Sequence, residues 1–387
     1  MKIAIIGGGA AGCFCAIGLK RRLPDAEVTV YEAGPKLLAK VAVTGGGRCN
    51  LTNSFRNVQR LGEVYPRGEQ LMRRALAVFS HEDTMRWFEA EGVRLTVQED
   101  QCVFPVSQDA MQIVRTLERC LRDAGVRVKL NSPVARVEDL QADHIVVTVG
   151  GSSREKLARL LPEGIELTDC VPSLFTLKIP DAGLRALMGT VVEQAALSLA
   201  GTKFRAAGTL LLTDWGVSGP ATLRLSSYAA RHLAENGYTG TLLVNWLDAP
   251  EAAAREWITA TAAAHPQKQA AGTPPDGITA RLWRHLLGRA GLREDLRWAE
   301  LGSKGAARLA ATLSADAYPV SGRARFKEEF VTCGGVALSG VNLNTLESKV
   351  CPGLWFAGEA LDVDAVTGGF NLQAAWSTAA VVAQALK

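Results

Sequence analysis

Three glycines near the start of the chain have the spacing that accommodates a dinucleotide. Gly7, Gly9 and Gly12 form a Gly-x-Gly-x-x-Gly motif, in which the first glycine permits a tight turn, the second lets the backbone approach a pyrophosphate and the third lets a helix pack on a strand. The following helix would present free N–H groups to the phosphates. Glu32, 20 residues after Gly12, could accept hydrogen bonds from ribose hydroxyls. These residues predict dinucleotide binding; the alternative is a glycine-rich structural turn.

The residues around this motif predict the elements that position it. Lys2–Ile6 is a short apolar run typical of a buried parallel strand, and Gly12–Leu23 has the spacing of a helix. Glu27–Tyr31 predicts a second strand, which ends at Glu32. The uncharged run over residues 3–19 has a rival interpretation as a signal peptide or membrane span. Because Gly7, Gly8, Gly9 and Gly12 interrupt this run and its 17 residues fall short of a bilayer, we expect a cytoplasmic protein without a membrane partner.

The other end of the chain favours a flavin as the dinucleotide. The apolar run 354–357 leads into Gly358 and Glu359, and Gly368–Asn371 opens the final helix. A glycine followed by an acid at a strand end can contact a pyrophosphate and ribityl hydroxyls. A second helix N-terminus can stabilise negative charge at the pyrimidine edge of a flavin. The alternatives are an ordinary turn and an ordinary helix cap.

A glycine-rich loop at Thr44–Asn50 is a third candidate part of the cofactor site. Its glycines permit close approach of the backbone, and its N–H groups could face a phosphate or a flavin edge. The alternative is a surface loop. No second Gly-x-Gly-x-x-Gly motif occurs, so the sequence predicts no separate NAD(P) domain. Either a nicotinamide docks transiently over the flavin, or the substrate itself supplies the hydride.

Composition restricts the class of protein further. The 387 residues are 48% apolar and 21% charged, as is usual for a globular chain of two or three domains. A net charge of +4 is too small by itself to indicate a nucleic-acid partner. The five histidines and eight cysteines have no metal-ligand spacing, and we expect the cysteines to be mostly buried thiols in a reducing compartment. The sequence identifies no catalytic residue and predicts no metal.

The pattern of the chain changes near Phe175, where an insertion is expected to interrupt the nucleotide-binding domain. Antiparallel strands are predicted first, followed by Ala- and Arg-rich helices. We therefore expect a discontinuous FAD-binding domain at 1–174 and 323–387, a β-rich insertion at 175–247 and a helical subdomain at 248–322. Within the first domain, further helices are expected at 71–91 and 109–124, and further strands at 126–130, 145–149 and 330–332.

Several segments of the chain together carry the pattern of one known family. They are residues 6–12, 44–53, 215–220, 331–336, 345–349, 358–364 and 368–373. In these segments, and in their order and spacing, the chain resembles the aminoacetone-oxidase-like (BaiN-type) FAD/NAD(P)-dependent flavoproteins of bacteria. The resemblance covers nearly the whole chain.

This resemblance implies an α/β fold: a glutathione-reductase-like FAD-binding Rossmann domain interrupted by a β-barrel-like insertion and a helical subdomain. It implies bound FAD, with NADH or NADPH as a transient co-substrate. It places Glu32 at the adenosine ribose, Val134 at the adenine through its backbone, and Glu359 at the ribityl chain and flavin. The residues expected to line the cofactor are Gly7, Gly9, Ala10, Ala11, Gly12, Glu32, Ala33, Lys40, Thr44, Gly46, Gly47, Arg48, Cys49, Asn50, Val134, Gly150, Gly358, Glu359, Gly369, Phe370, Asn371 and Leu372.

The resemblance fixes the cofactor better than the substrate. Members of the family oxidise an amine with oxygen or reduce a steroid-acid double bond, and Asp214 here replaces a histidine that many members carry. We expect an FAD-dependent oxidoreductase that transfers a hydride between a small organic substrate and flavin N5, with NAD(P)H or oxygen as the other partner. The alternatives are a flavin-dependent nucleic-acid-modifying enzyme, supported by the Arg-rich residues 281–308, and a non-catalytic flavin redox sensor. We expect no nucleic-acid partner and a monomer or small homo-oligomer.

Overall fold

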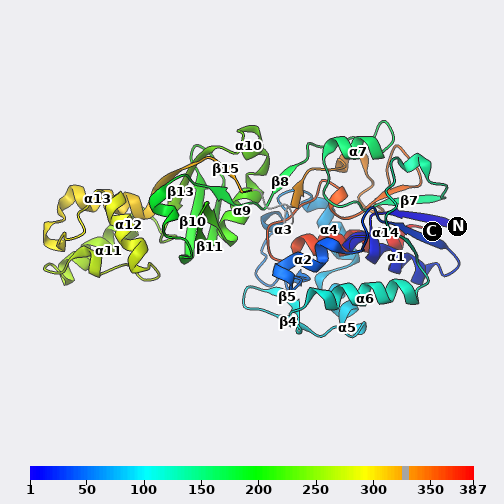
Figure 1. The fold of residues 1–387 in the computed structure, drawn as a ribbon, viewed down its shortest axis with the longest axis horizontal. Coiled ribbons are helices and arrows are strands. Elements are labelled where there is room, and N and C mark those ends of the chain that lie inside the picture. Colours follow the sequence, from blue (N-terminus) through cyan, green and yellow to red (C-terminus); the bar gives the residue numbers. More distant parts are fainter. Residues whose placement is uncertain (325–330) are drawn as a thin grey trace. The chain divides into compact units, whose positions relative to one another are not determined.

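The structure, a computed structural model, describes residues 1–324 and 331–387 and divides the chain into two units. One unit comprises Met1–Ser173 and Phe326–Lys387, and the other comprises Leu174–Arg325 (Figure 1). The second unit is thus an insertion into the first. The strand expected at 330–332 is β16 (Val331–Cys333), and Phe330 lies outside the described residues.

A five-stranded parallel sheet forms the centre of the first unit. Its strand order is β17-β7-β1-β2-β6, and all neighbouring strands are parallel. The apolar residues of β1 and β2 are buried, as expected of strands in a covered parallel sheet. The strands are β1 (Lys2–Ile6), β2 (Glu27–Tyr31), β6 (Arg127–Lys129), β7 (His144–Val147) and β17 (Leu354–Phe356).

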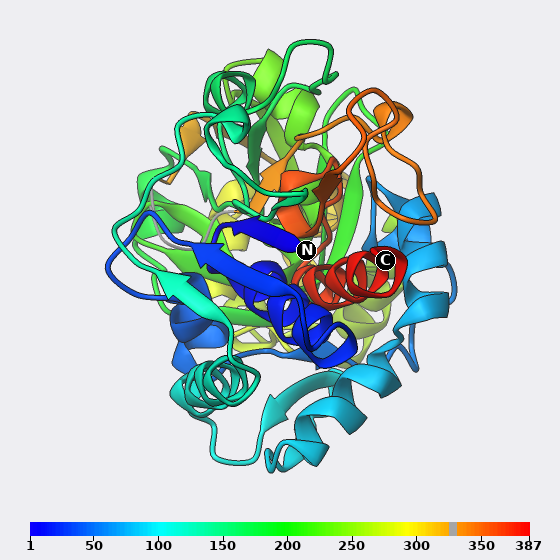
Figure 2. The ribbon, with the colours of Figure 1, turned by 90° about the vertical axis from the view of Figure 1, so that its right-hand side faces the viewer.

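The first and last helices of the chain pack against one another. α1 (Ala10–Arg22) and α14 (Phe370–Ala385) lie side by side in the first unit (Figure 2). A Cβ atom at Gly18 of α1 would lie 3.0 Å from the Ala383 Cβ, so the absence of a side chain permits this close approach. Twelve of the 16 residues of α14 are buried, so it is a core helix.

The single helix predicted over 71–91 is wrong, because the chain breaks between α4 (Glu69–Val78) and α5 (His81–Ala90). Ser80 starts α5 with a capping box. Its hydroxyl accepts a hydrogen bond from Asp83 N at 3.1 Å, and the Asp83 carboxylate accepts one from Ser80 N at 2.8 Å. The helical spacing of the apolar residues on both sides of Ser80 concealed this local stop signal.

The rest of the first unit consists of short elements around the sheet. β3, β5 and β4 form a three-stranded antiparallel sheet, and β8 pairs with β16. The elements are α2 (Ala39–Gly47), β3 (Thr52–Asn53), α3 (Leu61–Val64), β4 (Leu95–Val97), β5 (Cys102–Pro105), α6 (Ala110–Asp123), α7 (Arg154–Leu160) and β8 (Val171–Ser173).

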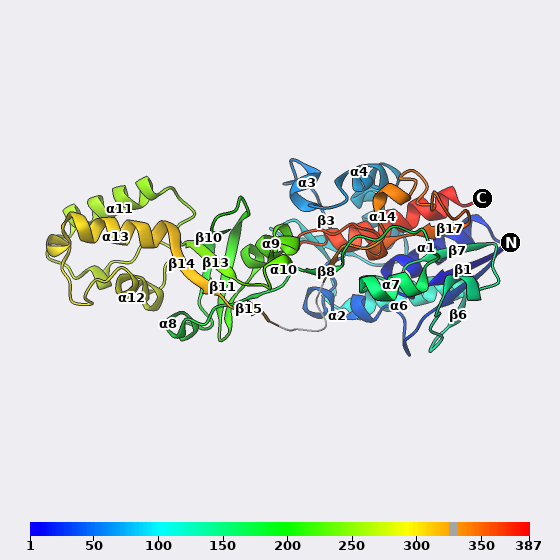
Figure 3. The same cartoon turned by 90° about the horizontal axis from the view of Figure 1, so that it is seen from above.

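The second unit combines a seven-stranded antiparallel sheet with helices (Figure 3). The strand order is β14-β13-β10-β11-β12-β9-β15. The strands are β9 (Leu177–Lys178), β10 (Val191–Leu199), β11 (Arg205–Thr213), β12 (Gly216–Ser218), β13 (Gly240–Asn245), β14 (Asp316–Val320) and β15 (Gly322–Arg323). The helices are α8 (Ala182–Arg185), α9 (Pro220–Tyr228), α10 (Ala230–Glu235), α11 (Glu251–Ala264), α12 (Ala280–Arg289) and α13 (Gly302–Ala315).

The described residues were also searched for helices that could span a membrane and for clusters that could bind a metal ion. None of the helices within 1–324 and 331–387 is both long and apolar enough to cross a membrane. The same residues contain no cluster of His, Cys, Asp and Glu that could hold a metal ion.

All eight cysteines lie in this described part of the chain, where no disulfide joins them, and six of them are buried. Burial raises the pKa of the Cys13 and Cys15 thiols, which keeps them protonated at neutral pH.

Candidate functional site

The carboxyl ends of four parallel strands bring predicted cofactor residues to one edge of the sheet. β1 leads into Gly7, β2 into Glu32, β7 into Thr148 and β17 through Ala357 into Gly358. The strands run parallel, so these four ends lie at the same edge. Open α/β sheets bind their ligands beyond this edge. Segments from both ends of the sequence therefore meet at one candidate site.

The three motif glycines have the geometry that a dinucleotide turn requires. Gly7 has a φ of +106°, and a Cβ there would lie 2.5 Å from the Thr148 carbonyl oxygen. A Cβ at Gly12 would lie 1.9 Å from the Gly7 carbonyl oxygen. At Gly9, by contrast, a Cβ would meet no described protein atom within 4 Å. Gly7 and Gly12 therefore pack the turn, whereas Gly9 faces open space beside Ala10, the first residue of α1.

Thr148 supports this turn and was missed by the sequence analysis. Its hydroxyl lies 3.0 Å from the Ile6 carbonyl oxygen and 2.9 Å from that of Gly7, within hydrogen-bonding distance of both. Gly358, which follows β17, packs closely against α1, because a Cβ at Gly358 would lie 2.8 Å from the Ala11 Cβ. No local pattern indicates this role, because Ile6 and Gly7 precede Thr148 by 142 and 141 residues.

Glu32 closes the turn with its carboxylate. Oε2 accepts a hydrogen bond from Gly8 N at 2.8 Å, and Oε1 accepts one from Gly34 N at 2.7 Å. Ser132 N donates to the Glu32 carbonyl oxygen at 2.9 Å, which places the loop of half-buried Val134 beside the end of β2. Each carboxylate oxygen can accept a further hydrogen bond, so Glu32 retains capacity for ribose hydroxyls.

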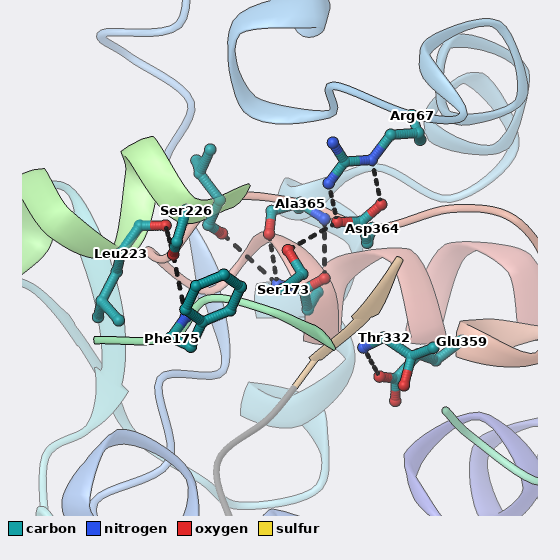
Figure 4. A network of polar contacts seen from close by, with 11 residues as sticks. Arg67, Ser173, Phe175, Leu223, Ser226, Thr332, Glu359, Asp364 and Ala365 are labelled. Carbon is teal, nitrogen blue, oxygen red and sulfur yellow. Dashed lines mark hydrogen bonds and ion pairs between the residues drawn. The ribbon is translucent and has the colours of Figure 1, made fainter. Parts of the chain in front are cut away.

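Glu359 joins three segments that are far apart in the sequence. Lys40 Nζ lies 3.2 Å from Oε2, and Thr332 N donates to Oε1 at 2.8 Å (Figure 4). A Cβ at Gly151 would lie 2.5 Å from Oε1. The carboxylate is thus held between α2, β16 and the turn after β7, at the same edge as the motif glycines.

The loop Thr44–Asn50 has an irregular backbone, although α2 formally extends to Gly47. Thr44 has an extended backbone, and Gly45 and Gly46 have φ values of +57° and +68°. Burial raises the pKa of Cys49 to about 12, so this thiol is not a thiolate at neutral pH. The loop therefore offers backbone groups, and its cysteine side chain is buried.

The start of α14 is held by two other segments. With its amide oriented to satisfy both neighbours, Asn50 accepts a hydrogen bond from Gly369 N at 3.2 Å and donates one to Thr52 O at 3.0 Å. The Tyr65 hydroxyl donates to the Phe370 carbonyl oxygen at 2.9 Å. These bonds fix the glycine-rich turn from which the helix begins.

Asn371 uses its side chain within its own loop. Its Oδ1 accepts from Ala365 N at 2.9 Å, and its Nδ2 donates to Ala365 O at 3.0 Å. These two bonds hold the Asn371 amide against the backbone of Ala365. The remaining predicted residues are Ala33 after β2, Gly47 and exposed Arg48 in the loop, Gly150 after β7 and Leu372 in the first turn of α14.

A buried ion pair lies beside this loop and was not predicted as part of the site. Arg67 Nε donates to Asp364 Oδ1 at 2.6 Å, and a second guanidinium nitrogen contacts Oδ2 (Figure 4). The Ser173 hydroxyl donates to the same Oδ2 at 3.0 Å. Burial raises the pKa of Asp364, and the arginine and the serine oppose that rise. Arg67 is distant in sequence from every recognised motif, so spacing gave no signal for it.

The geometry of this edge fits a bound dinucleotide. A Cβ at Gly9 would project into space that no described protein atom occupies within 4 Å, and the Glu32 carboxylate stands at the end of β2. Within the described residues, neither α1 nor α14 has a side-chain cap, so the N–H groups of both first turns are available to phosphate or carbonyl oxygens. The fold and the site together define a Rossmann-type dinucleotide-binding protein.

The family follows from comparison with known proteins. The model of the HI0933-like protein Rossmann domain matches residues 1–385, so the chain belongs to this family. The family resemblance found in the sequence is confirmed, as is the expected α/β Rossmann fold. The chain is an oxidoreductase with FAD as its cofactor.

Two relatives and one solved structure illustrate the range of similar proteins. The 3-dehydro-bile acid delta(4,6)-reductase of Clostridium scindens is 29% identical over 404 residues, covering 97% of each chain. The ribosomal RNA dihydrouridine synthase of Haemophilus influenzae is 28% identical over 407 residues, covering 97% of this chain and 96% of that protein. A point mutant of the FrdA subunit of Escherichia coli quinol fumarate reductase has a TM-score of 0.50 at 15% identity, covering 100% of this chain and 70% of that one, and shows the fold alone.

Proposed function

We propose that this chain is an FAD-dependent reductase that saturates a carbon–carbon double bond conjugated to a carbonyl group in a small organic substrate. NADH or NADPH is the electron donor. The observation that carries the proposal is that two relatives aligned over nearly the whole chain are named for this kind of change. One reduces a 3-dehydro-bile acid at delta(4,6), and the other forms dihydrouridine, a pyrimidine saturated beside a carbonyl. The substrates differ, whereas the type of bond is shared.

In this proposal the sheet edge holds the cofactor. The Gly7–Gly12 turn and the α1 N-terminus bind the pyrophosphate, Glu32 binds ribose hydroxyls, and the backbone at Val134 meets the adenine. Lys40, the Thr44–Asn50 loop, Gly150, Gly358 and Glu359 line the middle of the cofactor, and the first turn of α14 lies at the flavin. Bound FAD supplies the capacity to accept and deliver a hydride. The net reaction adds one hydride and one proton across the double bond and oxidises one NAD(P)H.

RNA is the second candidate substrate, because the Haemophilus influenzae relative is named for ribosomal RNA. Residues 249–315 of the second unit also contain nine Lys or Arg against six Asp or Glu. Several of these arginines have partners within the unit: Arg289 lies 2.6 Å from Asp316 and Arg293 lies 3.2 Å from Glu300. Since such pairs neutralise part of the excess charge, we rank a small molecule ahead of RNA.

Rapid-mixing spectroscopy on the holoenzyme tests this proposal. We expect anaerobic NADH or NADPH to bleach the flavin absorbance, and 2-cyclohexen-1-one or a 3-keto-4-ene steroid to restore it with formation of the saturated ketone. A uridine-rich RNA oligomer and dissolved oxygen are tested in parallel. Recovery of absorbance with RNA and not with either enone would replace the first candidate by the second. Recovery with oxygen alone would indicate an oxidase and contradict both.

A further inference from the structure

A buried glutamine joins the first turns of α14 to β3 and α5. Gln373 of α14 is fully buried. Its Oε1 accepts hydrogen bonds from the Thr52 hydroxyl at 2.5 Å and from the Thr84 hydroxyl at 3.0 Å. Its Nε2 donates to Ser377 Oγ at 2.8 Å, and Ser377 donates in turn to the Phe79 carbonyl oxygen at 2.7 Å. One side chain therefore contacts its own helix and two elements from other parts of the chain.

Thr52 connects this network to the glycine turn before α14. A Cβ at Gly369 would lie 2.3 Å from the Thr52 carbonyl oxygen, so the backbone of β3 lies directly against the turn. Asn50, two residues before Thr52, accepts a hydrogen bond from Gly369 N, and Gln373 N donates to the Gly369 carbonyl oxygen at 3.1 Å. The Thr52–Gln373 bond thus closes a ring of contacts around the turn. This ring joins the glycine-rich loop of the candidate site to the first turn of α14.

The burial of the Gln373 amide favours a role in orientation. Burying an amide costs free energy unless it is hydrogen-bonded, and an apolar side chain of similar volume avoids this cost. A satisfied network of buried polar groups, by contrast, rigidifies its members in one arrangement. Gln373 is 0% exposed and bonds three hydroxyl groups, so the fixing of α14 in one position accounts for it better than stability does.

We propose that Gln373 and Thr52 are positioning residues that hold the first turn of α14 against the Thr44–Asn50 loop and thereby set the reduction potential of bound FAD. The inference rests on the proposed function, which places this turn at the flavin. Reduction of FAD puts negative charge on the flavin ring. Free N–H groups at a helix N-terminus stabilise such charge, and the effect falls off within the first turn. The stabilisation therefore depends on where the turn is held.

The midpoint potential of the Gln373→Met holoenzyme tests this role. Methionine is unbranched and fills irregular core space, so it replaces the amide without a large change in packing. The two threonine hydroxyls keep second acceptors, the Asn53 and Ser80 carbonyl oxygens at 3.4 and 3.2 Å. We expect the two-electron midpoint potential to fall by about 30 mV, which corresponds to about tenfold weaker binding of reduced FAD relative to oxidised FAD. Stepwise anaerobic reduction with dithionite beside a reference dye measures this shift.

Two matched threonine variants separate positioning from stability. Thr52→Val and Thr84→Val each remove one buried hydroxyl that donates to the same oxygen of Gln373. Thr52 lies beside the glycine turn, whereas Thr84 lies on α5, which contributes no residue to the proposed cofactor edge. We expect similar losses of stability in urea. Thr52→Val should lower the potential as Gln373→Met does, and Thr84→Val should leave it within about 10 mV of wild type, or about twofold in relative binding.

The outcomes distinguish this inference from the proposed function. A Gln373→Met potential within about 10 mV of wild type would overturn the inference, as would equal shifts in the two threonine variants. No substrate enters these measurements, so a wild-type holoenzyme that reduces no conjugated carbonyl would overturn the proposed function without changing the potentials. If FAD bound elsewhere, Gly9→Ala apoprotein would also keep its affinity for FAD, whereas failure of the inference alone leaves that affinity impaired.

Discussion

Replacing Gly12 with alanine is expected to remove FAD from the protein and to destabilise the apoprotein. The new Cβ would lie 1.9 Å from the Gly7 carbonyl oxygen and 2.6 Å from Thr148 Oγ1. Both neighbours belong to the packed turn and sheet, so α1 must move away from β1. We expect the free energy of unfolding to fall by about 2 kcal/mol, as for other overpacked sites, and the affinity for FAD to fall about 100-fold, which corresponds to about 3 kcal/mol.

Urea denaturation of the apoprotein and titration of FAD by fluorescence quenching measure these two effects. Gly288→Ala is the matched control, because a Cβ at this position in α12 would meet nothing within 4 Å among the described atoms. Alanine in a helix interior is preferred over glycine by up to about 1 kcal/mol, so this control should be slightly stabilised and bind FAD normally. A Gly12→Ala protein with normal FAD affinity would show that the turn does not carry the cofactor.

The Asp364→Ala variant is expected to lose about 3–5 kcal/mol of stability, since it removes the carboxylate that contacts two nitrogens of the buried Arg67 guanidinium. The carboxylate is fully buried and also accepts the Ser173 hydroxyl, so three polar groups are affected. Urea denaturation measures the loss. Glu63→Ala removes one partner of an exposed pair with Arg60 and should cost less than about 1 kcal/mol.

The double variant Arg67→Met/Asp364→Leu distinguishes an uncompensated charge from lost packing. We expect it to recover most of the stability that Asp364→Ala loses, because no charge is then left buried. A double variant as unstable as Asp364→Ala would mean that the ion pair is itself a major stabilising contact.

The sequence predicted the parts of the fold that local patterns specify. The alternation of apolar strand, glycine turn and helix at residues 2–31 is enough to place Gly7, Gly9, Gly12 and Glu32, and the structure has these elements with ends shifted by at most two residues. The glycine-rich segments are also recognisable in the sequence. The structure explains them, because several of their glycines have positive φ values. Such features depend on residues close together in the chain.

The features that were missed depend on contacts between distant residues. The contact between Arg67 and Asp364 joins residues separated by 297 positions, and that between Thr148 and Gly7 joins residues 141 apart. A single sequence contains no signal for such pairs. The break at Ser80 is different: the capping box is local, but the apolar spacing of 71–91 fits one helix equally well. The location of the cofactor residues remains a prediction, and their gathering at one sheet edge supports it.

The affinity of Gly9→Ala apoprotein for FAD tests the location of the cofactor most directly. Gly9 has an extended backbone that alanine adopts readily, and its Cβ would meet no described protein atom within 4 Å. The substitution should therefore change apoprotein stability by less than about 0.5 kcal/mol. If the pyrophosphate of FAD lies against Gly9, the methyl group enters its space, and we expect the dissociation constant to rise at least about tenfold, or about 1.4 kcal/mol. An unchanged dissociation constant would contradict the account, because the dinucleotide would then bind elsewhere.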